Sequence, residues 1–454
     1  MLRKINSLLV GFFLFLSVFS LTSCDTGNTL LLLNWGEYIN MDLVSEFETK
    51  YNCEVVISLA DSNDLFYSKI KSGTTVYDLV VPSDYMVEKM YKKDLLQPID
   101  YTKLGFASFD DYLDTFVPGV KGIINDMENS SPGVKDYFVP YFWGSWGIMY
   151  NKRKAGLIDA IDKASAEGNV WKVMFEDKAI PAGTRVGMYE TSRYAYAAAM
   201  FYKGLSPNDN SVAALNAATD ALYNKKFTSW GTDTLKKDIA HNNLDLGFMW
   251  TGDFLDMLYT TLKTNTIDDV TFDIIIPDET IAFCDNFVLT KNARHTDLAY
   301  KFIKFFLDKD IAYRNASIVG YCTPIKDAYL EITKYKDSFK DVNELLSCTT
   351  IKTISYNTLS NKTYAVSGTY DNEKSFLLEV TAEELESIKE KYMTIIDDGE
   401  KDIDVNWLNN WAYAVNKYYP FEASSTKAYK GTPLTDLPRD YIDKINTICN
   451  NARV

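Results

Sequence analysis

Short apolar runs alternate with segments of helical periodicity from residue 29 onward, and this alternation limits the folds that the chain can adopt. In the first group, strands are expected at 30–34, 54–59 and 78–81, and helices at 43–50, 64–71 and 85–92. Such runs are typical of βαβ units, in which helices join parallel strands and cover the sheet. The sequence therefore predicts an α/β lobe with a mostly parallel sheet.

A second alternation follows the stretch FVPYFWGSWGIMYN, residues 138–151, in which two extended runs flank Gly144. It predicts strands at 185–189, 244–250 and 269–276, and helices at 194–202, 212–223 and 254–262. The run FCDNFVLT, residues 283–290, then leads to a strongly helical segment at 296–306. Extended segments near 140 and 285 are therefore candidate crossings between two α/β lobes that enclose a cleft.

The length of 454 residues also favours more than one globular unit. We expect a first lobe at 29–140 with a return segment at about 284–324, and a second lobe at 141–283 with about 325–340. Residues 341–454 form a C-terminal extension that we expect to pack on the second lobe. It contains a polar, Ser/Thr-rich stretch and two segments with helical character, at 381–396 and 406–419.

The N-terminus has the features of an export signal. Arg3 and Lys4 precede an apolar run at 5–21, which closes on LTSC. This ending resembles the bacterial lipobox, which implies a signal peptide at 1–23, cleavage before Cys24, acylation of its sulfur and a lipidated linker at 24–28. An ordinary signal peptide with an incidental cysteine is the alternative. We expect the protein on the extracellular face of the cell membrane, held by the lipid anchor.

Composition excludes several classes of function. The formal net charge of −15 argues against nucleic acid, which needs basic patches. The cysteines after Cys24 are widely spaced without a CxxC pair, so a disulfide framework is not expected. The two histidines, His241 and His295, form no metal-ligand pattern and no nucleophile–base pair. We therefore expect a binding protein, with no enzymatic activity, cofactor or metal.

Aromatic and acidic residues recur where the predicted strands end. The set comprises Trp35, Glu37, Tyr38, Ser83, Asp84, Tyr85, Trp250, Phe283, Asp285 and Tyr321. Ligands of open α/β sheets lie beyond the carboxyl ends of strands, so these side chains are expected to converge. Rings attract ammonium groups and pack on methylenes, while carboxylates form charge-assisted hydrogen bonds. The pattern suits a linear polyamine better than a sugar, which favours Asn, Gln and Arg beside Asp.

Several stretches together resemble the bacterial spermidine/putrescine-binding proteins of ABC importers. They are LNWGEYI, YDLVVPSDYMVEKM with LLQPID, VPYFWG, LGFMW, CDNFVLT and IVGYCTP, and the resemblance covers about residues 30–324. It implies a periplasmic-binding-protein-like fold that closes on a polyamine in the interlobe cleft. It also implies delivery of the polyamine to a membrane permease, and we expect the protein to be a monomer.

The resemblance assigns ligand contacts to individual positions: Trp35, Tyr38, Ser83, Tyr85, Trp250, Phe283, Asp285 and Tyr321. Asp285 is expected to hold an amine, and the rings to frame the methylenes. Glu37, at the lip of the cleft, either joins them or points to solvent. Ser83 can equally serve as a helix N-cap.

Three positions depart from the pattern of that family. Gly36 stands where a threonine is usual, and Phe283 where tryptophan is common. The family also carries an acidic pair where this chain reads MYETSRYAYAAA. Glu190 is the only acid near this place and is included as a candidate, while Tyr194 occupies the position of the second carboxylate. The preference between spermidine and putrescine is therefore open.

Two alternatives remain at this point. The same fold can serve as an adhesin or scaffold on the cell surface, with the C-terminal extension as its contact surface. A cleft without convergent carboxylates would favour that reading. The cargo can also be another organic cation or a sugar.

Overall fold

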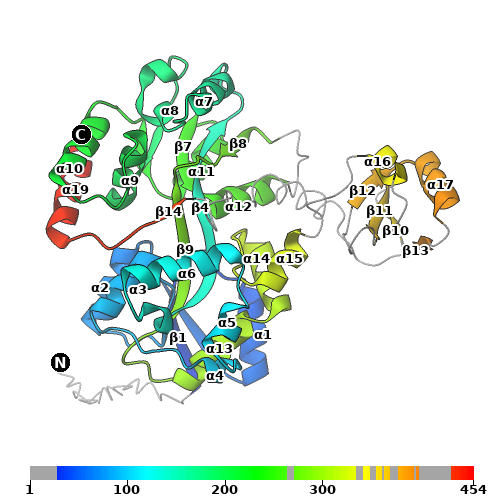
Figure 1. The fold of residues 1–454 in the computed structure, drawn as a ribbon, viewed down its shortest axis with the longest axis horizontal. Helices are drawn as coiled ribbons and strands as arrows, with labels where there is room; N and C mark the ends of the chain where they lie inside the picture. The colour runs from blue at the N-terminus through cyan, green and yellow to red at the C-terminus, as the bar shows by residue number, and fades with distance from the viewer. Residues whose placement is uncertain are drawn as a thin grey trace, which may run out of the picture.

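The computed structural model describes residues 28–262, 270–333, 341–347, 354–359, 362–368, 377–392, 395–397 and 431–454. Cys24, the signal sequence and the predicted helix at 406–419 lie outside these residues. Figure 1 shows two α/β lobes, one above the other, with β4 and β9 running between them. The predicted two-lobed α/β class is confirmed. None of the described helices is long and apolar enough to cross a membrane.

The first lobe has a parallel core of three strands. Strands β1 (Thr29–Asn34), β2 (Glu54–Leu59) and β3 (Leu79–Val80) pair in the order β2-β1-β3. They alternate with helices α1 (Met41–Tyr51), α2 (Asn63–Ser72) and α3 (Asp84–Lys92). Asn40 caps α1 and Ser62 caps α2 through their side-chain oxygens. The predicted elements of this lobe are thus observed within two residues at each end.

Two long strands cross between the lobes and make the main sheet mixed. Strand β4 (Val139–Asn151) pairs antiparallel with β9 (Ile281–Leu289), and β9 pairs antiparallel with β3. Strand β4 continues into the second lobe, where it pairs antiparallel with β7 (Leu246–Trp250) and β8 (Phe272–Ile275). The prediction of mostly parallel sheets is wrong for these pairs, because the crossing strands run against their neighbours.

The sequence predicted two extended runs on either side of Gly144. In the structure these runs form the single strand β4, and Gly144 lies within it. A Cβ atom there would lie 2.8 Å from Thr251 Oγ1 and 3.0 Å from the Phe283 ring. The glycine therefore permits close packing of the crossing strands beneath the cleft and lets β4 continue unbroken.

The second lobe contains the short parallel pair β5 (Gly187–Tyr189) and β6 (Ser229–Gly231). Its principal helices are α7 (Leu157–Ala166), α9 (Ser192–Tyr202), α10 (Val212–Tyr223), α11 (Thr234–Ala240) and α12 (Thr251–Leu262). The first lobe also contains the 13-residue helix α6 (Pro118–Ser130). The shorter elements of the two lobes are α4 (Tyr101–Leu104), α5 (Phe109–Leu113), η1 (Val134–Tyr137), α8 (Lys172–Phe175) and η2 (Asp177–Ala179).

After β9 the chain returns to the first lobe. Helices α13 (Thr296–Phe306), α14 (Lys309–Val319) and α15 (Lys326–Thr333) follow in order. Phe47 of α1 packs against Phe302 and Phe305, and Lys326 N donates to Thr115 O at 2.8 Å. The described part of 325–340 thus contacts the first lobe, where Ile325 also bridges to Phe116.

The C-terminal residues form two separate parts. The first comprises α16 (Val342–Ser347), β10 (Ile354–Leu359), β11 (Lys362–Gly368), β12 (Leu377–Val380), α17 (Ala382–Lys391) and β13 (Ile395–Asp397), with its own buried cluster. The helix expected at 381–396 ends at Lys391, and the strand β13 follows. The second part, β14 (Thr432–Pro433) and α19 (Arg439–Ala452), joins the main core; α19 packs on α9 and α10.

Gly431 offers a test of how tightly the C-terminal part joins the crossing strands. Its φ is +105°, and a Cβ atom would lie 2.8 Å from Ala282 N. Gly431→Ala should lower the free energy of unfolding by roughly 2–5 kcal/mol through backbone strain and overlap. Gly168→Ala is the control, because it has positive φ with open space around it, and should cost about 1 kcal/mol. Urea unfolding measures both variants. An equal decrease in the free energy of unfolding for Gly431→Ala and Gly168→Ala would contradict the close contact at Gly431.

Candidate functional site

A cavity of about 400 Å³ lies between the lobes. The first lobe and the return segment contribute Trp35, Gly36, Glu37, Tyr38, Leu59, Ala60, Asp61, Ser62, Asn63, Asp64, Leu65, Ser83, Tyr85, Val319 and Tyr321. The second lobe and β9 contribute Tyr189, Thr191, Tyr194, Thr232, Asp233, Lys236, Trp250, Asp253, Asp256, Phe283 and Asp285. Segments far apart in the sequence therefore form one site, as the strand-end pattern predicted.

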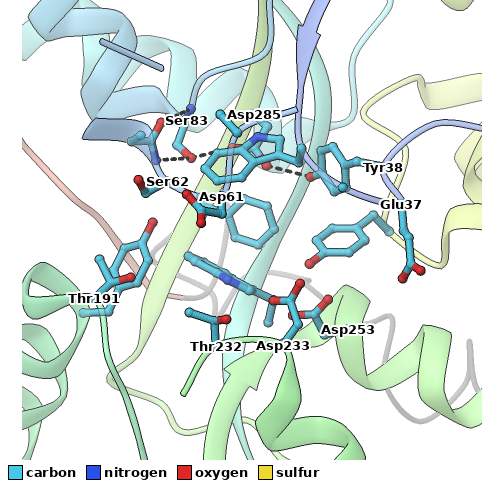
Figure 2. Close-up of a pocket in the computed structure, with 18 of the residues that line it drawn as sticks. Glu37, Tyr38, Asp61, Ser62, Ser83, Thr191, Thr232, Asp233, Asp253 and Asp285 are labelled. Carbon is cyan, nitrogen blue, oxygen red and sulfur yellow. Dashed lines mark hydrogen bonds between the residues drawn. The ribbon is translucent and has the colours of Figure 1, made fainter. Parts of the chain in front are cut away.

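Asp285 is the central polar group of the cavity. It lies on the crossing strand β9 and is only 6% exposed. Tyr38 Oη donates to one carboxylate oxygen at 2.6 Å, and Ser83 Oγ donates to the other at 2.6 Å (Figure 2). Burial raises the pKa of Asp285 to about 6, although both hydroxyls act to lower it. No ion pair among the described residues neutralises this carboxylate.

The hydroxyl of Ser83 is aligned by a neighbouring amide. Asn63 Nδ2 donates to Ser83 Oγ at 3.0 Å, and Ser83 N donates to Asn63 Oδ1 at 3.0 Å. Ser83 occupies the N-cap position of α3, but its side chain makes no capping hydrogen bond. Ser83 thus begins α3 without a side-chain cap, because its hydroxyl binds the Asp285 carboxylate, and its contact with a ligand stays a prediction. Its donor proton is directed at Asp285 because Asn63 occupies the oxygen from the other side.

Aromatic rings enclose the space around Asp285. Tyr38 packs edge-on against Tyr321 at 4.7 Å, and Trp250 packs edge-on against Phe283 at 4.7 Å. Trp35 is fixed by a 2.8 Å hydrogen bond from its Nε1 to Val81 O. These contacts orient the rings before any ligand enters, which lowers the entropy lost on binding.

A second acidic group lies on the opposite side of the rings. Figure 2 shows Asp233 and Asp253 together on the second-lobe side, across from Asp285. Asp253 is 7% exposed, and burial raises its pKa to about 6. Lys236 Nζ lies 3.1 Å from an oxygen of Asp253 and 3.1 Å from one of Asp256. This pole is therefore partly neutralised from within, whereas Asp285 is not.

The structure brings together all of the predicted contact residues except Glu190. Glu190 is exposed at the end of β5 and does not line the cavity; its backbone carbonyl accepts a hydrogen bond from Arg453. Glu37 lines the cavity, but it is exposed at its edge with a φ of 53°. Tyr194, one turn after Glu190, lies in the cavity instead.

Sequence reasoning missed the acids of the second lobe and of the α2 region. Asp253 follows Trp250 by three residues, but the helix was expected to begin at 254 and begins at Thr251. Asp61 and Asp64 lie beside the Ser62 cap of α2 and line the cavity, but the sequence pattern did not single them out. The sequence does contain a signal for Asp253, because this acid follows Trp250, the last residue of a predicted strand, within one helical turn.

Polar side chains of the two lobes interact on two sides of the cavity. The Tyr194 hydroxyl, from α9, interacts with Tyr85 of α3 and with Asn63 of α2. Tyr321, from the return segment, interacts with Asp253 of α12. The lobes thus touch across the cavity, and the arrangement has the character of a closed binding protein.

Comparison with known proteins gives a consistent match. Residues 42–342 match the family model described as bacterial extracellular solute-binding protein. The spermidine/putrescine-binding periplasmic protein of Escherichia coli K12 is 28% identical over 312 residues, 67% of this chain and 80% of that protein. The match to the family model ends at residue 342, before helix α19.

Solved structures agree with the fold. The spermidine/putrescine ABC transporter substrate-binding protein of Streptococcus pneumoniae has a TM-score of 0.51 at 27% identity, covering 66% of this chain and 84% of its own. A putative spermidine/putrescine ABC transporter protein from Listeria monocytogenes has a TM-score of 0.58 at 23% identity. That likeness covers 94% of this chain and 99% of the Listeria chain, so it includes the C-terminal part of the fold.

The raised pKa of Asp285 predicts a stability effect in the ligand-free protein. The native carboxyl keeps its proton to about pH 6, whereas an ordinary aspartic acid loses its proton near pH 3.8, so its favourable contribution to stability is present at low pH and lost as the pH rises through 6. The free energy of unfolding of Asp285→Asn, relative to that of wild type, should therefore rise by about 1–2 kcal/mol between pH 5 and pH 8. Urea unfolding at both pH values measures this, with exposed Asp159→Asn as control. A difference in the free energy of unfolding between Asp285→Asn and wild type that is the same at both pH values would contradict the raised pKa of Asp285.

Proposed function

The chain belongs to the bacterial extracellular solute-binding protein family, and on this premise we propose that it captures a polyamine, spermidine or putrescine, for an ABC importer. The polyamine lies in the interlobe cavity and is passed to a membrane permease. Support comes from the E. coli and S. pneumoniae relatives, whose names state spermidine/putrescine binding.

One observation carries the choice of a cationic ligand. Asp285 is buried, holds only hydroxyl partners among the described residues and lies among aromatic rings. An ionised carboxylate in such a place is costly unless a cation joins it. A ligand ammonium supplies that cation, and the ring faces of Trp35, Trp250 and Tyr38 attract it further.

The opposite pole explains why the ligand carries more than one charge. Asp233, Asp253 and Asp256 line the cavity with Lys236, the one lysine or arginine among the described lining residues, so the three acids outnumber the cation that pairs with Asp253 and Asp256. Between this pole and Asp285 lie rings that pack on methylenes. A flexible chain with ammonium groups at its ends matches this order of anion, apolar wall and anion.

Ligand binding and lobe closure are coupled in this proposal. The contacts come from the first lobe, the return segment and the second lobe, so the ligand binds the closed state more tightly than an open state. The closed form is then the species that the permease recognises. Cys24 serves as the lipid-anchored end on the outer face of the membrane, and the protein acts as a monomer without catalytic activity.

The scaffold alternative has no specific observation in its favour. A cleft without convergent carboxylates was the feature that would have favoured it, and Asp285 and Asp253 converge on one cavity. Titration with sugars distinguishes the cargo alternative, because a sugar requires no ionised carboxylate.

Calorimetric titration with spermidine and putrescine tests the proposal. Wild type should bind at least one of them, and Asp285→Asn should raise its dissociation constant roughly 10- to 100-fold through loss of a charge-assisted hydrogen bond. Asp159→Asn, an exposed change on α7, should bind as wild type. A panel of sugars and choline serves as the cargo control. Binding of a sugar but no polyamine would reject the assignment.

The pH dependence of binding gives a separate test. Because the ligand-free pKa of Asp285 is about 6, protonation below that value removes the anion that the ammonium needs. Affinity should be about tenfold weaker at pH 5 than at pH 7, with protons released on binding near pH 6. Burial also raises the pKa of Asp84 beside it and that of Asp253 at the opposite pole, so Asp285→Asn, which keeps both of these acids, isolates the part of the pH dependence that belongs to Asp285. An affinity that is equal at both pH values would contradict this role.

A further inference from the structure

The segment after residue 430 is attached to the second lobe by its backbone. Strand β14 pairs with the second-lobe end of β9, and Thr432 N donates to Thr280 O at 2.9 Å. Asn208 holds the next residues from both sides: its Nδ2 donates to Pro433 O at 2.8 Å, and its Oδ1 accepts from Thr435 N at 2.9 Å.

Helix α19 extends this attachment to the wall of the cavity. Tyr441 Oη lies 3.0 Å from Tyr196 Oη of α9. Arg453 donates to the carbonyl of Glu190 and lies over the Trp230 ring at 5.2 Å. In Figure 1 the red segment runs from β14 to the outer side of α9 and α10. It thus supports the turn that precedes Tyr194.

Between these two attachments, one side chain reaches the first lobe. Asp436 Oδ1 lies 3.6 Å from Lys89 Nζ of α3, and the two side chains are only 25% and 23% exposed. Lys89 is also 4.0 Å from Asp64, which lines the cavity and whose side chain is 73% exposed. The ion pair with Asp436 therefore joins the lobes at a partly shielded position.

The same face of α3 makes both contacts with the second lobe. Tyr85 and Lys89 are four residues apart, so they lie on one face of the helix. Tyr85 meets Tyr194 of α9, while Lys89 meets Asp436 of a segment anchored on α9. Both contacts form only when α3 and α9 are close together, which is the closed arrangement.

We propose that Asp436 and Lys89 are positioning residues that latch the lobes in the closed state and slow the release of ligand. The latch lies outside the ligand cavity and, on the Asp436 side, outside residues 42–342 that match the family model. Its effect on ligand release rests on the proposed polyamine binding, but its effect on the lobes does not. Breaking the pair favours the open state without altering any ligand contact.

Stopped-flow tryptophan fluorescence with spermidine tests the latch. Asp436→Asn should raise the dissociation rate constant about three- to fivefold, the range of a partly exposed ion pair, and leave the association rate constant unchanged. The charge-swapped variant K89D/D436K should return the rate to within twofold of wild type. Asp297→Asn is the matched control, because its pair with Lys103 at 3.3 Å lies within the first lobe, and it should release ligand as wild type does.

A ligand-independent measurement separates the latch from the polyamine assignment. Small-angle X-ray scattering should show a larger radius of gyration for ligand-free Asp436→Asn than for wild type, and the charge-swapped variant should restore the wild-type value. Absence of spermidine binding by wild type would overturn the proposed function and leave this scattering test valid. A radius of gyration for Asp436→Asn equal to that of wild type, or a charge-swapped variant no better than Asp436→Asn, would overturn the latch.

Discussion

The buried carboxylate of Asp285 is the constraint on which the site depends. Two hydroxyls at 2.6 Å reduce the cost of its charge but do not cancel it, so its pKa remains near 6. Tyr38 and Ser83 are aligned by packing and by Asn63, so the donors do not reorganise when the group ionises. The unfavourable charge is thus kept in the ligand-free protein, where a cation can relieve it.

The place of Asp285 on a crossing strand links this charge to the two lobes. Strand β9 pairs with β3 in the first lobe, with β4 along the crossing and with β14 at its second-lobe end. A backbone bridge joins Ser83 to Asp285, so the first-lobe helix α3 begins directly at the anion. Movement of one lobe relative to the other therefore changes the surroundings of the carboxylate.

The local pattern of the sequence predicted the elements and most of the cavity, because strand-end aromatics and acids are visible without knowledge of topology. Strand direction was not visible: an apolar run such as β4 reads the same whether its neighbours are parallel or antiparallel. Asp253 was missed because the helix boundary was placed too late, and Glu190 was misplaced because spacing does not show which way a side chain at a strand end points. The contacts of β14 and α19 depend on a return over hundreds of residues, which periodicity cannot reveal.

The two acidic poles are asymmetric, and this asymmetry clarifies how the site selects its ligand. Lys236 lies between the buried Asp253 and the partly exposed Asp256 at hydrogen-bonding distance, so the protein itself shows the geometry in which an ammonium pairs with carboxylates of this cavity. At Asp285 the corresponding place is open to the cavity and framed by rings. The internal ammonium of Lys236 offsets the charge of one pole without any ligand, so the acids of that pole are not left unpaired in the second lobe. Under the proposed function, the other pole gains comparable stabilisation from a ligand cation that enters between the lobes, and such a cation favours closure because it contacts both.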